Sequence, residues 1–484
     1  MIKYEEGIIA GKKANLKRYY RYLSSKNPYP KNEMILKDGD KTETDPFSCG
    51  NILKKTFAAA FTDPRHTTVV PYQLPRRDAE ITELNFSIAS IERILRNLKT
   101  PKSPGPDQSS NILLKKFTRQ FAPPLFLLFS KMHETGVIPK CFKEAIVIPI
   151  FKKGNKQDPN NYRPVSLTSC IMKVFEKIIL DSMINFIDEH NILSPHQHGF
   201  FRKRSTATNL LNFWHDLTCL ANQRSQVTVI YTDMSKAFDR IPHNFLVDKL
   251  DKMGFRGNIL RLIKSYLSDR FQAVSVKGFL SDPMNVTSGT PQGGVLSGLL
   301  FALYINVLPG VVPNVHIYIY ADDVKLMMPI NSTVDVRMMQ SQVNAQSAWC
   351  DAWGLPMNPD KCEFIHYVPR NHNSINPTYN IKGTPIKKAS TVKDLGITIS
   401  DDLKFNIHIE NITKKTNREI GRARRSFKCR RPLFMADLYK TYICPNLEYC
   451  PQLWNQIHST LALKIKKTQN RFTRLIPRGR NICF

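Results

Sequence analysis

The sequence predicts a mixed α+β fold, and three observations support this prediction. Apolar residues recur at helical spacing in several segments before residue 220. β-branched and aromatic runs between residues 227 and 328 are typical of strands, and the pattern after about residue 403 is helical again. Hydrophobic residues make up 42% of the 484 residues, as in ordinary folded proteins, and this length allows about three globular units.

The first predicted element follows a polar, lysine-rich segment. We expect residues 1–84 to form a loosely organised basic leader and linker. A helix is then predicted after a cap at Ser87, where apolar residues recur at Ile88, Ile91, Leu95 and Leu98. Proline at positions 101, 104 and 106 ends this helix, because proline cannot continue the backbone hydrogen bonding.

Strands and buried helices are both expected in the next segment. The apolar run at residues 145–151 predicts a strand that enters a turn at 152–154. Apolar stripes at residues 171–179 and 210–217 predict two buried helices, with a basic loop at 202–204 between them.

Acidic residues end two of the predicted central strands. Residues 227–232 form a β-branched and aromatic run that predicts a buried strand, and Asp233 follows it directly. The strand-like runs 315–320 and 324–328 flank Ala321-Asp322-Asp323, a pattern typical of a tight hairpin. The sequence therefore predicts acids at the tip of this hairpin.

The charge of the chain favours a polyanionic partner. Lys and Arg number 70 against 40 Asp and Glu, which gives a formal charge of +30. Residues 411–484 alone contain 17 Lys and Arg against three acids, so we expect a separate basic helical module there. Because phosphates release counterions when Lys and Arg replace them, nucleic acid is the favoured partner and a membrane surface is the rival.

Several protein classes are disfavoured by the same sequence. The first residues lack the apolar stretch of a signal peptide, and no apolar run reaches the ~20 residues that span a bilayer. We therefore expect an intracellular protein with no membrane partner. The ten cysteines include no C-x-x-C pair, which argues against a zinc module and against a disulfide framework.

Asp233, Asp322 and Asp323 lie in apolar strand contexts of a chain that is short of acids. Carboxylates drawn out of water repel one another unless cations neutralise them, and hard oxygen ligands select Mg²⁺. Two such ions about 3.5–4 Å apart would permit an in-line displacement at a triphosphate. Because neighbours on a strand face opposite sides, Asp322 is the expected principal ligand. For the Asp-Asp pair alone, ordinary turn chemistry explains the residues better.

Six motifs occur in order along the chain. They lie at residues 102–107 (KSPGPD), 161–167 (NYRPVSL), 197–200 (QHGF), 231–239 (YTDMSKAFD), 290–294 (TPQGG) and 320–323 (YADD). Together they closely resemble the reverse transcriptases of non-LTR retrotransposons, jockey-like elements especially, over roughly residues 85–455. Any one tetrapeptide is weak evidence, whereas the order and spacing of all six are specific.

The resemblance implies a right-hand polymerase with fingers, an antiparallel-sheet palm and a helical thumb. The expected division is a leader and linker at 1–84, fingers with an N-terminal extension at 85–226, a catalytic palm at 227–403 and a basic helical thumb with the C-terminal region at 404–484. Residues 395–397 resemble the segment that grips the primer.

The resemblance also implies roles for the acids and for one lysine. Asp233, Asp322 and Asp323 match the catalytic, metal-binding aspartates of the family. Lys361 matches a lysine that serves as a general acid toward pyrophosphate. A surface lysine after a turn is the alternative for Lys361.

The resemblance assigns nucleotide binding to five further residues. Lys152 and Arg163 match fingers residues that hold the triphosphate, and Gln292 and Gly293 match a nucleotide-contacting turn. Phe238 matches a bulky residue that excludes a ribose 2′-hydroxyl. The alternatives are a solvated basic turn for Lys152 and a core aromatic for Phe238.

The implied function is RNA-directed DNA polymerisation, in which a DNA primer is extended on an RNA template from deoxynucleoside triphosphates with two Mg²⁺ ions, or Mn²⁺ instead. Residues 1–84 are too short for the endonuclease that complete elements carry, so we expect an endonuclease encoded elsewhere in the element as a partner. We expect a nuclear location at the site of integration. Two alternatives stay open: a catalytically silent, element-derived RNA-binding protein, and a group II intron-type or domesticated polymerase.

Overall fold

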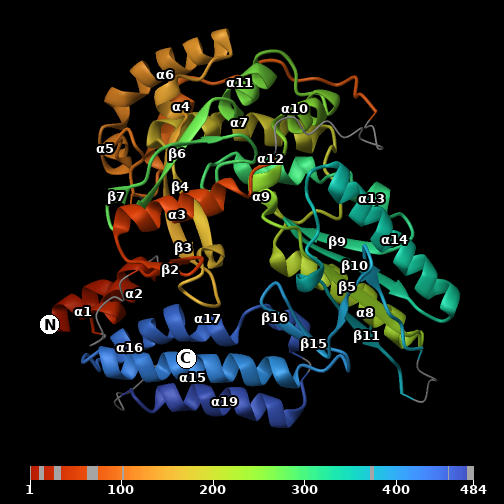
Figure 1. The fold of residues 1–484 in the computed structure, drawn as a ribbon. Coiled ribbons are helices and arrows are strands. Elements are labelled where there is room, and N and C mark those ends of the chain that lie inside the picture. The colour runs from red at the N-terminus through yellow and green to blue at the C-terminus, as the bar shows by residue number, and fades with distance from the viewer. Residues whose placement is uncertain are drawn as a thin grey trace.

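The computed structural model describes residues 2–9, 16–26, 34–62, 75–100, 103–370, 375–455 and 457–476. The fold is a mixture of helices and sheets, as predicted (Figure 1). Pro101 and Lys102, from the first predicted turn and the first motif, lie outside the described residues. Among the helices described, none is long and apolar enough to cross a membrane.

The bounds of the helices are as follows: α1 Ile2–Ile9, α2 Leu16–Ser25, α3 Pro46–Ala58, α4 Ile88–Arg96, α5 Asn111–Lys116, α6 Thr118–Thr135, α7 Cys170–Glu189, α8 Thr206–Asn222, α9 Ala237–Arg240, α10 His243–Lys252, α11 Gly257–Leu267, α12 Ser297–Tyr304, α13 Leu308–Val311, α14 Thr333–Ala352, α15 Asn406–Ser426, α16 Pro432–Leu438, α17 Cys444–Leu447, α18 Pro451–Trp454 and α19 Ser459–Thr473. Ser87 caps helix α4, and its capping box with Ser90 satisfies free N–H groups of the first turn.

A five-stranded sheet carries the predicted acidic strand ends. Its order is β14-β11-β5-β10-β9, with bounds β5 Val227–Thr232, β9 His316–Tyr320, β10 Asp323–Pro329, β11 Glu363–Tyr367 and β14 Lys387–Lys388. Neighbouring strands are antiparallel except for the short pair β11 and β14. The strand predicted at 227–232 and the hairpin predicted at 315–328 are both confirmed.

A second five-stranded sheet has the order β4-β3-β6-β7, and β8 also pairs with β6. Its strands are β3 Glu144–Phe151, β4 Tyr162–Leu167, β6 Arg270–Val276, β7 Phe279–Leu280 and β8 Met284–Val286. Three of these strands lie after residue 227, although they join strands that precede it. The expected boundary at 226/227 therefore does not separate the two sheets.

Three two-stranded ladders complete the strands, with bounds β1 Leu36–Asp38, β2 Lys41–Glu43, β12 Asn380–Ile381, β13 Thr384–Pro385, β15 Thr391–Asp394 and β16 Ile397–Ser400.

Both faces of the first sheet are buried. Ile230 and Leu326 face a large apolar cluster that includes residues of α7, α10, α12 and α14. Their neighbours Val229 and Met327 face a second cluster, to which α8, β15, β16 and α18 contribute. Because side chains alternate along a strand, burial of both faces explains why β5 and β10 are nearly continuous apolar runs.

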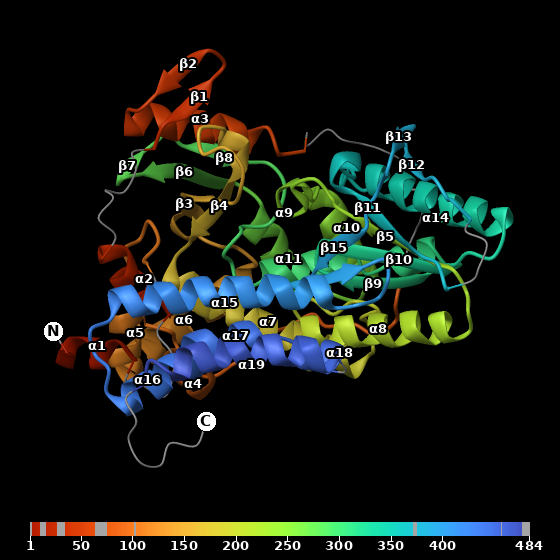
Figure 2. The ribbon, with the colours of Figure 1, turned by 90° about the horizontal axis from the view of Figure 1, so that it is seen from below.

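The first two helices are part of the C-terminal helical module rather than a loose leader, which corrects that expectation. The rings of Tyr19 and Tyr442 stack with centroids 3.8 Å apart. The buried carboxylate of Glu5 accepts hydrogen bonds from the Tyr22 hydroxyl at 2.6 Å and from the Cys429 N–H at 2.7 Å. Both views place α1 and α2 beside the helices of this module (Figure 1, Figure 2). Stacked aromatics and satisfied polar groups hold this contact.

Helix α3 covers the second sheet. Leu53 and Phe57 form an apolar cluster with Val147 of β3 and Val274 of β6. The hydroxyl of Thr62 donates to the carbonyl of Arg240 at 2.5 Å, so this segment reaches the region just after the predicted first acid. Residues 46–62 are thus a packed part of the fold.

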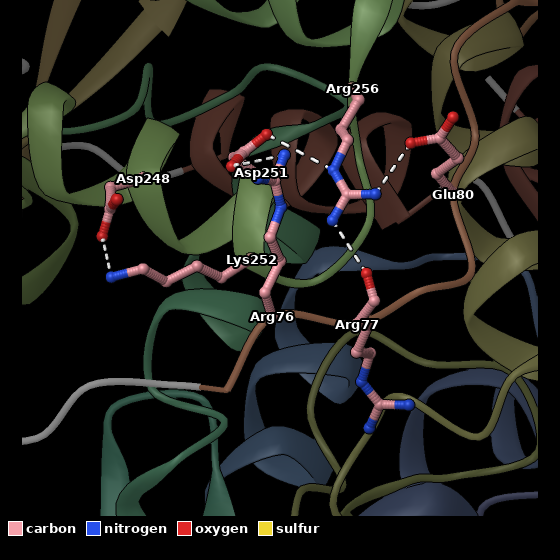
Figure 3. Close-up of polar contacts among 7 residues, drawn as sticks. All are labelled: Arg76, Arg77, Glu80, Asp248, Asp251, Lys252 and Arg256. Atoms are coloured by element: carbon pink, nitrogen blue, oxygen red, sulfur yellow. Dashed lines mark hydrogen bonds and ion pairs between the residues drawn. The ribbon is translucent and has the colours of Figure 1, made fainter.

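Ion pairs and hydrogen bonds fix residues 75–84 to α10 and to the connection between α10 and α11 (Figure 3). The Arg256 guanidinium lies 2.7 Å from Glu80 and donates to the carbonyl of Arg77 at 2.8 Å. Asp251 accepts ion pairs from both Arg76 and Arg256, at 3.7 and 3.6 Å. A network of several charges holds an extended segment more firmly than one exposed pair does.

Candidate active site

The register of β5 and β10 brings the predicted acids together. Thr232 lies opposite Val324, so the end of β5 meets the start of β10. Asp233 follows Thr232 directly, and Asp322 and Asp323 precede Val324. Asp233 and the pair Asp322 and Asp323, which follow it by 89 and 90 positions, therefore share one edge of the sheet.

The hairpin that carries Asp322 is tightly supported. Tyr320 pairs with Asp323, so Ala321 and Asp322 form the two-residue turn, and Ala321 has a φ of 56°. A positive φ is strained for alanine and needs support from the surroundings. The side-chain oxygen of Gln197 accepts from the N–H groups of Gly199 and Ala321 at 2.7 and 3.2 Å. Gln197 thus links the turn to the 196–199 segment.

Like charges act on both hairpin acids. Burial raises the pKa of Asp322, and the charge of Asp233 raises it further, while its own backbone N–H and the charges of Arg163 and Lys152 lower it. Desolvation, followed by the charges of Asp322, Asp394 and Asp233, raises the pKa of Asp323 to about 6. Carboxylates that repel one another in this way are stabilised by a cation.

Lys361 lies at this cluster. It ends a short 3₁₀ turn, Pro359–Lys361, and its Nζ is 3.3 Å from Oδ2 of Asp233. The backbone N–H of Asn358 donates to the carbonyl of Asp233 at 2.9 Å, which fixes this turn against the end of β5. The ammonium therefore balances part of the carboxylate charge.

The donor set fits a divalent cation by its chemistry. Carboxylate oxygens are the hard ligands that Mg²⁺ and Mn²⁺ prefer, and mutual repulsion among these carboxylates is what such an ion relieves. Among the described residues, however, no group of three or more His, Cys, Asp or Glu side chains is arranged as a ready metal site. Asp233 faces Lys361 in the arrangement seen here.

The fingers residues of the prediction lie on the neighbouring sheet. Arg163 on β4 pairs with Ile150 on β3, and the N–H of Lys152 donates to Asn161 at 2.8 Å. Both side chains are exposed, and the positive charge of each is close enough to Asp322 to lower its pKa. Two cations therefore border the carboxylates, where a triphosphate would be attracted.

Gln292 is held by a carboxylate that the prediction left without a role. Its side-chain Nε2 lies 2.8 and 2.9 Å from the two oxygens of Asp239, and its backbone carbonyl accepts from the Ser166 N–H at 2.7 Å. Gly293 has a φ of 133°, and a Cβ there would lie 2.5 Å from the Ser166 carbonyl oxygen. Glycine is therefore required at this close approach.

Phe238 is packed between two other rings. Its ring stacks on Phe301 with centroids 4.4 Å apart and meets the edge of Phe200 at 5.9 Å. It lies in α9, five residues after Asp233, and is half-buried. The geometry thus gives Phe238 a packing role, and a gate role stays a prediction.

The family model for reverse transcriptases (RNA-dependent DNA polymerases) matches residues 150–399, more than half of the chain. The chain belongs to the reverse transcriptase family. All of the described site residues named above, from Lys152 to Lys361, lie within the matched region.

Three of the curated relatives of this chain come from mobile elements of Drosophila melanogaster. The RNA-directed DNA polymerase from mobile element jockey is 27% identical over 405 residues, which cover 81% of this chain and 44% of the relative. Proteins of transposon BS and of transposon X-element are each 27% identical, over 80% and 81% of this chain. The chain spans 44% of the length of each of these relatives. The resemblance to jockey-like non-LTR reverse transcriptases is confirmed.

Among solved structures, this chain is similar to the apo telomerase of Candida tropicalis truncated from its C-terminal domain, with a TM-score of 0.38 and 14% sequence identity. The match covers 61% of this chain and 60% of the telomerase chain.

Two residues that support the site received no role from the sequence. Gln197 and Asp239 both lie inside quoted motifs, and both are positioned by contacts between distant segments. The one available signal was their place inside these motifs. His198, in the same motif as Gln197, is buried, which lowers its pKa to about 4, and its Nδ1 lies 2.9 Å from the Thr208 hydroxyl.

Proposed function

We propose that this chain is an RNA-directed DNA polymerase of a non-LTR retrotransposon, which extends a DNA primer on an RNA template from deoxynucleoside triphosphates. The observation that carries the proposal is the register of β5 and β10, which sets Asp233 beside the hairpin of Asp322 and Asp323 in a chain of the reverse transcriptase family.

The proposal includes a right-hand arrangement. The sheet β14-β11-β5-β10-β9 serves as the palm, the sheet of β3 and β4 with α4 to α8 serves as the fingers, and α15 to α19 form the thumb. Residues 85–226, 227–403 and 404–484 correspond to these parts, with residues 270–286 added to the fingers sheet.

Asp233, Asp322 and Asp323 are the proposed catalytic residues and would hold two Mg²⁺ ions, with Mn²⁺ as a substitute. Bound there, these ions would supply activation of the primer hydroxyl and neutralisation of the triphosphate. The primer 3′-oxygen forms a bond to the α-phosphorus, and the bond from that phosphorus to the leaving pyrophosphate breaks.

The other residues bind, orient and supply a proton. Arg163 and Lys152 attract the triphosphate, and Gln292 and Gly293 border the nucleotide from the opposite turn. Phe238 contacts the sugar and excludes a 2′-hydroxyl. Lys361, whose Nζ lies 3.3 Å from Asp233, donates a proton to the departing pyrophosphate.

We also propose an endonuclease encoded in the same element as a partner, and a nuclear location at the site of integration. The +30 charge suits both nucleic-acid strands of the substrate.

Primer extension tests the proposal. The full chain is incubated with a DNA primer on an RNA template, and in parallel on a DNA template, with Mg²⁺, with Mn²⁺ or with a chelator. We expect extension on RNA that stops with the chelator and returns with either ion. Salt-sensitive RNA binding without extension would instead support a catalytically silent RNA-binding protein.

A further inference from the structure

A small hairpin lies next to the catalytic strands. Its strands β15 and β16 pair with each other and, among the described strands, join neither five-stranded sheet. The turn between them consists of Leu395 and Gly396, with φ values of 42° and 97°. Strand β14 of the catalytic sheet ends at Lys388, and the Ala389 N–H donates to the carbonyl of Phe364 on β11 at 2.8 Å, so the backbone fixes the base of this hairpin. The far end of the hairpin, with its turn, shares no backbone ladder with the sheet and is positioned by side chains.

A buried ion pair makes this connection. Nζ of Lys325, on β10, lies 2.6 Å from Oδ2 of Asp394, the last residue of β15. The two side chains are 3% and 4% exposed, and no other ion pair among the described residues has both side chains so deeply buried. The ammonium also lies over the ring of Phe213, 4.4 Å from its centroid.

The connection reaches the catalytic hairpin. Lys325 is two residues after Asp323, and the carboxylate of Asp394 is close enough for its charge to act on Asp323. A buried ion pair contributes little net stability, because desolvation of the two charges offsets their attraction. The ion pair instead fixes the relative position of the two strands, because each buried charge is stable only next to the other.

Tyr449 holds the same turn from the opposite side. Its hydroxyl donates to the carbonyl of Leu395 at 2.8 Å, and its Oη lies 2.9 Å from Oγ1 of Thr206 on α8. A Cβ on Gly396 would lie 3.1 Å from the tyrosine ring, so glycine permits this contact. The turn is therefore fixed between the catalytic sheet and the C-terminal module.

We propose that Lys325 and Asp394 are positioning residues that hold the Leu395–Gly396 turn at a set distance from the catalytic hairpin. Residues 395–397 resemble the segment that grips the primer, so a primer end that rests on this turn would be directed to the edge of the sheet that carries Asp233 and Asp322. The inference rests on the proposed function and deepens it, because it names the residues that set the primer end rather than those that react.

Three variants of the full chain test the inference, and a fourth serves as a control. Asp394→Asn removes the charge, Asp394→Glu keeps the charge but lengthens the side chain by one methylene, and Tyr449→Phe removes only the hydroxyl. Lys387→Met is the control, because it breaks an exposed pair with Glu363 on the same sheet, whose side chains are 71% and 31% exposed.

Steady-state primer extension and thermal unfolding are measured together. We expect kcat to fall about 10–100-fold in both Asp394 variants and about 3–10-fold in Tyr449→Phe, because small displacements of reacting groups are costly. The nucleotide KM and the primer–template affinity should stay within about twofold of wild type. Asp394→Glu should unfold near the wild-type temperature, and Lys387→Met should match wild type in every measurement.

The outcomes are distinct. Wild-type kcat in folded Asp394→Glu and Tyr449→Phe would overturn the inference, even if Asp394→Asn does not fold. A loss of kcat that equals the unfolded fraction at the assay temperature would also overturn it. A wild-type chain that binds primer–template without extending it would overturn the proposed function together with the inference, whereas active wild type with unaffected variants overturns the inference alone.

Discussion

The half-buried carboxylate of Asp239 lies within hydrogen-bonding distance of the side-chain amide of Gln292 through both of its oxygens, at 2.8 and 2.9 Å from Nε2. Burial raises the pKa of Asp239 to about 6, although the Gln292 hydrogen bond and the charges of Lys236, Arg163 and Arg240 oppose this. Asp239, which orients the proposed nucleotide contact Gln292, therefore destabilises the folded chain when it is ionised.

Asp239→Asn should reveal this cost through its pH dependence. The folded chain binds a proton at Asp239 up to about pH 6, whereas the unfolded chain releases it near pH 4, so the wild type loses stability as pH rises between these values. Asparagine lacks this titration. We expect the wild type to lose up to about 3 kcal/mol relative to the variant between pH 4 and pH 7.5.

Urea unfolding of both chains at the two pH values measures the change. Contributions from Asp322 and Asp323 cancel in the difference between the chains, because both chains retain those residues. A difference that stays constant with pH would contradict the assignment of a raised pKa to Asp239.

Asp233→Asn and Asp322→Asn should each reduce nucleotide incorporation by about 10³-fold or more, because either change removes a charged ligand from the proposed metal site. Salt-sensitive template binding should persist, since it depends on Lys and Arg rather than on these acids. Asp248→Asn is the matched control, because Asp248 forms an exposed pair with Lys252 at 2.8 Å (Figure 3). Wild-type extension by either site variant would refute the assignment.

Phe238→Val should weaken the discrimination between deoxyribonucleotides and ribonucleotides by about tenfold or more, because a smaller side chain leaves room for a 2′-hydroxyl. The ratio of kcat/KM for matched dNTP and rNTP pairs measures this effect. Loss of the stack on Phe301 should also lower the unfolding free energy by about 1–3 kcal/mol. Phe279→Ala, at an exposed ring on β7, should change neither quantity. An unchanged sugar preference in folded Phe238→Val leaves this residue with packing alone.

Gly199→Ala should displace the catalytic hairpin. A Cβ at residue 199 would lie 2.6 Å from the backbone nitrogen of Ala321, so the strained turn has to move. We expect kcat to fall about 10–100-fold and the unfolding free energy to fall by about 1–3 kcal/mol.

Gly421→Ala is the matched control for that change. A Cβ at residue 421 in α15 meets only the flexible end of Arg425 at 3.6 Å, and alanine favours helix by about 1 kcal/mol over glycine. This variant should be as active as wild type and slightly more stable. Full activity in Gly199→Ala would contradict the support that we assign to the 196–199 segment.

Local patterns were sufficient for the elements that build the site. The cap at Ser87, the apolar run before Asp233 and the alternation around Ala321-Asp322 each depend on residues close in sequence, and the helix, strand and hairpin formed as expected. The carboxylate edge followed from these elements because antiparallel neighbours place the end of one strand beside the start of the next.

Contacts between distant segments were beyond the reach of the same reasoning. Lys325 is buried against Asp394, which lies 69 residues away in the sequence. The Glu5 carboxylate accepts hydrogen bonds from the backbone N–H groups of Lys428 and Cys429. Nothing in the neighbourhood of either charge specifies its partner. The same holds for β6, which joins β3 across more than 100 residues.

The Glu5 carboxylate accepts a hydrogen bond from the backbone N–H of Lys428, which is synthesised 423 residues later. At about 5–20 residues per second, a ribosome needs roughly 20–85 s between the two positions. Throughout that interval the aromatic face of α2, with Tyr19 and Tyr22, has been made while its binding surface has not. Newly made chains therefore pass through a long stage in which they are prone to aggregate. Expression at a lower temperature or with added chaperones should raise the yield of folded protein more than substitutions in the catalytic sheet would.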